Sequence, residues 1–311
     1  MNLRYPLAAD ARIASIWAPA AVAAMLRVAC GGGGNSLPGF PTVSSSSATG
    51  ANGQPVMYSR QLLITLNGSS LDGGLSVTSP GCQAGPVLST AAPYVSSATT
   101  AYYLCTVSGL GASQVNVARA SDSAVLATPT YTVPMPQVTV TAKNVPPGSV
   151  NGVMVFTLAP DKTPVTVQNF LAYVNNGFYD GTVFHNAVSG FVIEGGVYRP
   201  ITPGVAPVAQ TPLGNAIALE VGRGLSNTQW SIAIGRAGAP DLVTSQFFIN
   251  VVDNSARLDP GPTAGNAVFG AVTTGTAVAS SIFSAPTPCT PLAGIGCVPS
   301  PNVVITATQT Q

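Results

Sequence analysis

Short segments in which apolar and polar residues alternate, broken by turn residues, most limit the folds open to this chain. Such segments lie at residues 61–66, 74–78, 101–107, 114–118 and 130–133, and turn sequences such as Asn67-Gly68 and Ser108-Gly109 separate them. Alternation with a period of two residues is typical of β-strands with one buried face. The pattern predicts a mainly β chain with a small β-sandwich over residues 54–135.

The composition excludes some function classes. Only 7% of the residues are charged and the formal net charge is +1, whereas soluble domains average roughly 25% charged residues. No cluster of lysine and arginine is present, so we expect no nucleic acid as a partner. His185 is the single histidine and no cysteine pair has metal-site spacing, so no metal or other cofactor is predicted.

Residues 1–30 have the pattern of an export signal. Arg4 and Arg12 precede the apolar residues 13–26, a stretch shorter than the about 20 residues that cross a membrane, and small residues lead to Cys30. The sequence Val28-Ala29-Cys30 resembles a bacterial lipoprotein signal, although Arg27 departs from the aliphatic residue usual there. We expect a periplasmic or cell-envelope protein anchored to the membrane by lipid on Cys30. Cleavage by a general signal peptidase, without an anchor, is the alternative.

The five cysteines leave one residue over after any pairing. An exported chain meets an oxidising compartment, so disulfides are expected. With Cys30 as the odd cysteine, the preferred pairing joins Cys82 to Cys105 and Cys289 to Cys297.

The region between the signal and the sandwich is rich in glycine, serine and proline. Residues 31–53 carry few large apolar side chains, which predicts a flexible, disordered linker. Beyond it, Cys105 is similar to the strand-borne cysteine of immunoglobulin-like domains, but no tryptophan lies between Cys82 and Cys105. The sandwich is therefore expected to be either immunoglobulin-like or a generic one.

The pattern changes over residues 136–311, where helices join the strands. Residues 137–141, 153–158 and 303–307 alternate as strands. Thr163 and Pro164 suit the start of a helix and Gly177 its end, and residues 276–283 form a second helical pattern. Strands closed on themselves with two helices predict a barrel.

Five sequence motifs in this region resemble the successive landmarks of the cyclophilins, most closely the bacterial extracytoplasmic members. They are residues 163–170 (Thr-Pro-Val-Thr-Val-Gln-Asn-Phe), 177–185 (Gly-Phe-Tyr-Asp-Gly-Thr-Val-Phe-His), 190–196 (Gly-Phe-Val-Ile-Glu-Gly-Gly), 244–250 (Thr-Ser-Gln-Phe-Phe-Ile-Asn), and 258–259 (Leu-Asp) with 267–270 (Ala-Val-Phe-Gly). The resemblance implies an eight-stranded antiparallel β-barrel capped by two helices. It also implies peptidyl-prolyl cis-trans isomerase activity on proline-containing peptides or unfolded exported proteins.

The reaction defines what the site must contain. The X-Pro amide rotates over a barrier of roughly 18–20 kcal/mol, because its C–N bond has partial double-bond character. A catalyst must hold the proline ring and stabilise the twisted amide better than either planar form. An apolar pocket and a donor aimed at the prolyl nitrogen meet that need without a nucleophile or a metal.

The resemblance assigns Asn186 and Gln246 as the catalytic residues, and it also assigns the residues that bind the substrate. The apolar pocket is assigned to Phe191, Val192, Phe248 and Leu258, and the polar contacts to the peptide backbone are assigned to Gln246 and Glu194. Val192 stands where the family usually has methionine, and Glu194 where it usually has glutamine. The alternative is that the phenylalanines are core residues. Because neighbours on a strand point to opposite faces, we expect Phe247 in the core and Phe248 in the pocket.

Asn186 is the main departure from the family pattern. Cyclophilins carry an arginine there as the donor to the prolyl nitrogen, and asparagine is shorter and uncharged. Losing one preorganised donor costs roughly 10²- to 10³-fold in rate elsewhere, so we expect a weak isomerase. Arg199, Arg236 or Arg257 could supply a replacement guanidinium. Arg257 is also expected to contribute to substrate binding, because it lies beside Leu258 in the sequence.

Two functions therefore remain open for the barrel. One is an isomerase that assists the folding of exported proteins, weakened by Asn186. The alternative is a catalytically poor, chaperone-like envelope module that binds proline-containing peptides. In either case His185 is expected to be structural, because isomerisation transfers no proton. A third possibility is a structural protein whose sandwich is the working part.

Overall fold

Strands dominate the computed structural model, which describes residues 39–202, 204–236, 242–260, 265–284, 290–292 and 295–311. The predicted signal peptide, Cys30 and Cys289 lie outside these residues. Within them, no helix has both the length and the apolar character needed to cross a membrane.

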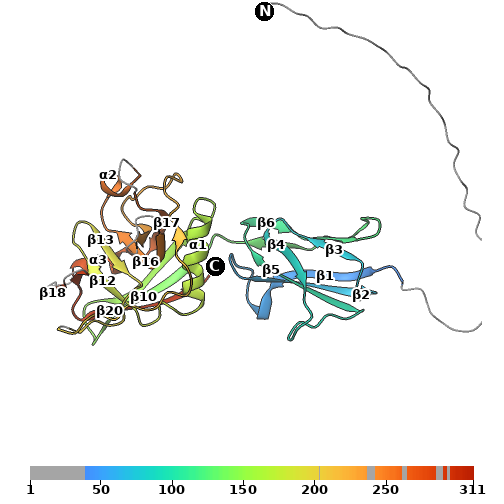
Figure 1. The fold of residues 1–311 in the computed structure, drawn as a ribbon, viewed down its shortest axis with the longest axis horizontal. Helices are drawn as coiled ribbons and strands as arrows, with labels where there is room; N and C mark the ends of the chain where they lie inside the picture. Colours follow the sequence, from blue (N-terminus) through green and yellow to red (C-terminus); the bar gives the residue numbers. More distant parts are fainter. Residues whose placement is uncertain (1–38, 203, 237–241, 261–264, 285–289, 293–294) are drawn as a thin grey trace, which may run out of the picture. The chain divides into compact units, whose positions relative to one another are not determined.

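The first part of the chain forms three antiparallel sheets, coloured blue to green in Figure 1. The four-stranded sheet has the order β1 (Thr42–Gly50), β2 (Gln61–Ser69), β5 (Thr100–Val107) and β4 (Cys82–Leu88), and a 3₁₀ helix (Ala51–Gly53) follows β1. The smaller sheets are β3 (Leu75–Thr78) with β7 (Asn116–Arg119) and β8 (Val125–Ala127), and β6 (Gly111–Gln114) with β9 (Thr130–Val133).

These sheets share one core, as the predicted β-sandwich requires. Alternate residues of β2 and β5 are buried, and they pack with buried residues of the smaller sheets, among them Val117 and Tyr131. The predicted Cys82–Cys105 disulfide is confirmed and joins β4 to β5. Cys297 is also disulfide-bonded. Its pairing with Cys289 stays a prediction, because Cys289 lies outside the described residues.

The linker predicted for residues 31–53 is wrong from Thr42 onward. Thr42–Gly50 is strand β1 and pairs with β2 along its length, from Thr42 opposite Ser69 to Gly50 opposite Leu62. The run of serines lacks large apolar side chains, so its composition is that of a linker. Backbone hydrogen bonds to β2 define this strand, and small polar side chains are tolerated on its exposed positions.

The second part of the chain closes into an antiparallel barrel of eight strands, as predicted. Their order is β13 (Val192–Gly195), β12 (Val183–Ala187), β20 (Asn302–Gln309), β10 (Gln137–Val145), β11 (Asn151–Leu158), β17 (Val268–Thr274), β15 (Ser231–Arg236) and β16 (Leu242–Asn250). Pairing of β16 with β13 closes the ring, and β14 (Ile217–Ala218) adds to β16. A separate hairpin consists of β18 (Thr290–Leu292) and β19 (Gly296–Val298).

Two helices pack against the barrel, and both were predicted. Helix α1 (Pro164–Asn175) has Thr163 at its N-cap position, but the Thr163 side chain makes no capping hydrogen bond. A backbone N–H of the first turn, that of Thr166, instead donates to Glu220 Oε2 at 2.7 Å. Helix α3 (Thr276–Ser284) buries Ala279 and Ile282. A single turn, α2 (Ser255–Leu258), precedes β17.

Aromatic rings fill the interior of the barrel. The ring of Phe247 makes edge contacts with Phe156, Phe170, Tyr179 and Phe184 at centroid distances of 5.5–6.0 Å. Phe247 is therefore a core residue, as the alternation of β16 predicted, and its neighbour Phe248 belongs to the other face of the strand.

Candidate functional site

A row of directly paired residues crosses five strands of the barrel. Asn186 on β12 lies opposite Glu194 on β13, Glu194 opposite Phe248 on β16, Phe248 opposite Ala233 on β15, and Ala233 opposite Val268 on β17. Residues paired across neighbouring strands have Cβ atoms about 4.5–5.5 Å apart. The row thus brings together side chains that are far apart in the sequence.

This row lies on the outer face of the barrel. The chain neighbours Ile193, Ile232 and Phe247 belong to the interior core, and successive side chains of a strand point to opposite faces. On β12 the register shifts between Phe184 and Asn186, so His185 is the extra residue of a bulge. The bulge allows Phe184 to fill the core while Asn186 joins the outer row.

The apolar members of the row belong to a hydrophobic cluster separate from the core, which we call the outer-face cluster. It comprises buried Val192, Ala233, Phe248 and Val268, packed against partly buried Phe191, Leu225 and Leu258. Val192 and Phe248 are each 3% exposed, so they form the floor. The partly buried residues form the side that a ligand can reach.

All four apolar residues assigned from the sequence meet in this cluster, and three further members were missed. Ala233, Leu225 and Val268 carried no assigned role. Alternation along residues 231–236 could have placed Ala233 on the face opposite Ile232 and Ile234. Leu225 lies in a loop that offers no such signal.

Asn186 is held at both ends of its side-chain amide. Its Nδ2 donates to Glu194 Oε2 at 2.6 Å, and its Oδ1 accepts from Cys297 N at 2.8 Å. The β18–β19 hairpin lies so close that a Cβ added to Gly296 would collide with Asn186 Oδ1. The amide therefore points toward Glu194.

Glu194 is a half-buried carboxylate at the polar end of the row. Burial raises the pKa of Glu194, and hydrogen bonds from the side chains of Asn186 and Gln246 lower it. Burial has the larger effect, so the pKa lies above its usual value. Among the residues that the structure describes, the ion pairs are Arg119–Asp122 and Lys162–Asp161. No described cation therefore pairs with this carboxylate.

Gln246 stands two residues before Phe248 on β16 and thus on the same face. Its side chain lies over Gly235 of β15, where an added Cβ would come within 2.6 Å of Gln246 Cγ. That approach requires glycine at position 235. The polar side chains of Gln246 and Glu194 consequently adjoin the outer-face cluster.

The three candidate arginines differ in what they contact. The guanidinium of Arg257, on α2, lies over the ring of Phe191 at 4.1 Å from its centroid, a cation–π contact. Arg199 donates to Asp180 O and to Gln210 Oε1, each at 2.8 Å. Arg236 donates to the backbone oxygen of Gly265. Arg257 is thus the arginine that the structure places against the outer-face cluster.

Buried asparagines hold the partly exposed side of the cluster, and sequence analysis missed them. Asn254 Nδ2 donates to Phe191 O and to Asn250 Oδ1, both at 2.8 Å. Asn227 Nδ2 donates to Leu258 O at 3.0 Å and to Asp259 Oδ1 at 2.9 Å. Asn227 and Asn254 lie outside the five motifs, so the motifs did not mark them.

Asp259 anchors the residue next to Leu258. Burial raises the pKa of Asp259, but hydrogen bonds from Ser226 and Asn227 outweigh it and leave the pKa below its usual value. The ionised carboxylate is therefore the form that fixes this turn.

Comparison with known proteins decides the family. The family model for cyclophilin-type peptidyl-prolyl cis-trans isomerases matches residues 141–310. The chain belongs to the cyclophilin family. The resemblance seen in the five motifs is thereby confirmed.

Bacterial cyclophilins are among the relatives. The peptidyl-prolyl cis-trans isomerase of Acinetobacter baylyi is 41% identical over 127 residues, covering 41% of this chain and 64% of the relative. Isomerase A of Dickeya dadantii is 42% identical over 126 residues, covering 40% and 63%. Isomerase cyp18 of Streptomyces antibioticus is 41% identical over 134 residues, covering 42% and 77%. The chain spans a little under two thirds of the length of the first two of these relatives.

A solved cyclophilin-type isomerase of Cryptosporidium parvum aligns with this chain. The alignment covers 56% of this chain and 99% of the solved one, with 18% identity and a TM-score of 0.42.

His185 lies inside the cyclophilin domain and is buried. It is 3% exposed, and its ring meets that of Tyr198 edge-on at 5.0 Å. Burial lowers the pKa of His185 to about 4, and its Nδ1 has no hydrogen-bond partner among the described residues. The imidazole is neutral at pH 7, which favours the expected structural role.

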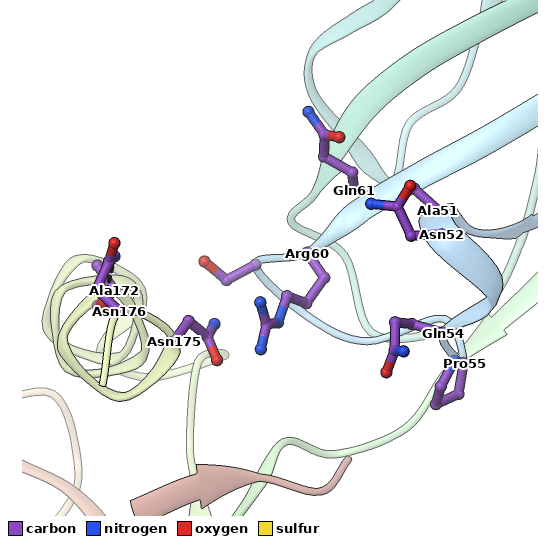
Figure 2. Close-up of a pocket in the computed structure, with 10 residues that line it drawn as sticks. Ala51, Asn52, Gln54, Pro55, Arg60, Gln61, Ala172, Asn175 and Asn176 are labelled. Carbon is purple, nitrogen blue, oxygen red and sulfur yellow. Dashed lines mark hydrogen bonds between the residues drawn. The ribbon is translucent and has the colours of Figure 1, made fainter. Parts of the chain in front are cut away.

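A polar cavity of about 490 Å³ lies apart from the residues assigned to the site, and Figure 2 shows its lining. The lining residues are Ala51, Asn52, Gln54, Pro55, Ser59, Arg60, Gln61, Ala172, Asn175 and Asn176. None of them belongs to the row or to the outer-face cluster.

Proposed function

We propose that this chain is a peptidyl-prolyl cis-trans isomerase with weakened catalysis, acting on proline-containing segments of exported proteins. The observation that carries the proposal is the convergence of Phe191, Val192, Phe248 and Leu258 beside the polar side chains of Gln246 and Glu194. An apolar surface edged by hydrogen-bonding groups suits a proline ring with a polar backbone on either side.

Each part of the site has a task in this reaction. The proline ring contacts Phe191 and Leu258, two of the three partly exposed members of the outer-face cluster. Gln246 carries an amide that can both donate to and accept from the peptide backbone. Holding the ring still while the preceding carbonyl turns lowers the barrier only if the twisted amide is held better than the planar one.

The donor to the prolyl nitrogen is the weak part of the site. Asn186 occupies the arginine position, and its Nδ2 is committed to Glu194 at 2.6 Å. The N–H that Glu194 accepts is unavailable to the prolyl nitrogen, and the two contacts of the amide fix the direction of its second N–H. This commitment also favours the alternative function, a module that binds proline-containing segments and accelerates their isomerisation little.

Substitution of Phe191 tests the proposed site. We expect Phe191→Ala to lower kcat/KM for a proline tetrapeptide about tenfold. The proline ring of the peptide loses part of its apolar contact with the protein, and that contact contributes roughly 1.5 kcal/mol of binding free energy. NMR exchange spectroscopy measures the isomerisation rate directly. The matched control is Phe283→Ala on α3, a partly buried phenylalanine that packs against the interior core.

The outcomes separate the two functions. Equal losses in Phe191→Ala and Phe283→Ala would contradict the assigned site. Peptide binding without any acceleration by the wild type would favour the binding module over the isomerase.

We further propose that the protein is exported and held at the cell envelope by lipid on Cys30. Arg4 and Arg12, the apolar residues 13–26 and the sequence Val28-Ala29-Cys30 support this proposal. Mass spectrometry of the purified protein is expected to show an acylated Cys30 as the mature N-terminus. An unmodified Cys30, or cleavage at another position, would reject the anchor.

A further inference from the structure

We propose that Glu194 makes the site selective for proline segments that carry a lysine or arginine next to the proline. The inference rests on the proposed function, since it names the class of substrate that the same site prefers. It follows from the position of the carboxylate, from the neutral groups beside it and from the lack of a cationic partner for it among the residues that the structure describes.

The position places the carboxylate where a substrate passes. Glu194 lies between Asn186 and Phe248 in the row and shares the outer face with Val192, two residues earlier on β13. A proline ring on the outer-face cluster therefore has Glu194 beside it, and residues flanking the proline come within reach of the carboxylate.

Within the described residues, the groups that contact the negative charge of Glu194 are neutral. Asn186 Nδ2 donates to Glu194 Oε2 at 2.6 Å, and the amide cannot turn away, because its Oδ1 is fixed by Cys297 N at 2.8 Å. Gln246 acts on the same carboxylate and is also neutral. In the described part of the chain no lysine or arginine lies within ion-pair distance of Glu194.

A carboxylate accepts hydrogen bonds and donates none. With two neutral amides already beside it, the strongest interaction that a substrate can add is a charge-assisted hydrogen bond from a cation. Partial burial strengthens such a pair, because half-buried charges are screened less by salt than exposed ones.

Arg257 is the competing charge at the cluster, and it would favour acidic substrates. Its guanidinium is exposed and lies over the ring of Phe191. An exposed charge is screened by solvent and contributes little to an ion pair. The half-buried Glu194 therefore dominates the preference of the site.

A charge series of peptides tests the inference. Tetrapeptides with one Ala-Pro bond carry lysine, norleucine or glutamate at each position flanking the proline in turn. Binding is measured by NMR titration and isomerisation by NMR exchange, at low and high salt, for the wild type and Glu194→Gln. The control is Glu220→Gln, which removes the same charge from a carboxylate bound to Thr166 on α1.

In the wild type, at one flanking position or more, we expect lysine to be preferred over glutamate by about threefold to tenfold at low salt, and by less at high salt. Glu194→Gln is expected to bring the two peptides within about twofold of each other. Glu220→Gln is expected to keep the preference of the wild type.

The possible failures are distinguishable. Equal binding of lysine and glutamate peptides, or a preference that survives Glu194→Gln, overturns the inference and leaves the proposed function intact. Selective binding of lysine peptides without acceleration supports the inference and rejects the isomerase. A wild type that binds none of the peptides rejects both.

Discussion

Asn186→Arg is expected to raise kcat/KM for a proline tetrapeptide about a hundredfold or more. In the wild type the Asn186 amide is committed to Glu194 and to Cys297 N. An arginine carries five N–H donors on a longer side chain, so it can pair with Glu194 and still present a donor to the prolyl nitrogen. One preorganised donor is worth roughly 10²- to 10³-fold in rate. NMR exchange with the same peptide measures the gain, and peptide affinity is expected to change little.

Asn186→Gln is the control for this prediction, because it lengthens the side chain without adding charge. It is expected to leave the rate within a few-fold of the wild type. A thermal melt of each variant shows whether losing the acceptor for Cys297 N disturbs the barrel. A wild type already as fast as its arginine-bearing relatives would contradict the donor argument.

Lowering the pH from 7 to 4.5 is expected to cost the barrel about 2 to 3 kcal/mol through His185 alone. Burial lowers the pKa of His185 from 6.5 to about 4 in the folded state. As the pH falls below 6.5, His185 therefore becomes protonated in the unfolded chain but stays neutral in the native chain until the pH approaches 4. The stabilisation is complete above pH 6.5 and is lost as the pH falls toward 4.

His185→Phe and His185→Gln both remove this proton, so each is expected to reduce the loss between pH 7 and 4.5 by that amount. Denaturant titrations followed by fluorescence of Trp230, the tryptophan of the barrel, give the free energy of unfolding at each pH. Glu194 acts in the opposite direction, because its raised pKa favours the native state at low pH. The comparison of variant with wild type cancels that contribution. If the wild type, His185→Phe and His185→Gln lose the same free energy of unfolding between pH 7 and 4.5, His185 does not titrate as described.

Regular strands and helices with a clear period were predictable from the sequence. The alternation of β16 assigned Phe247 to the core and Phe248 to the outer face, and both places are confirmed. Pro164 and Gly177 bounded α1 correctly. Strand β1 was not predictable, because its serines give no apolar period and its pairing with β2 depends on the backbone.

The apolar part of the site followed from the family motifs, whereas its polar geometry did not. The sequence identified Asn186 as a departure, but its engagement by Glu194 and by the β18–β19 hairpin depends on contacts over 111 residues of sequence. The support of Phe191 by Asn254 is likewise non-local. A side chain that is polar and isolated in the sequence gives no sign of which backbone group it will meet.

Closure of the barrel through β13 and β16 also decides when the site exists. Glu194 and Phe248 become neighbours only in that pairing, and every other member of the row is added by a further strand of the same ring. A nascent or truncated chain that lacks one of these strands lacks the complete row. Binding of a proline-containing segment would therefore begin in one step, when β13 pairs with β16 and the barrel closes.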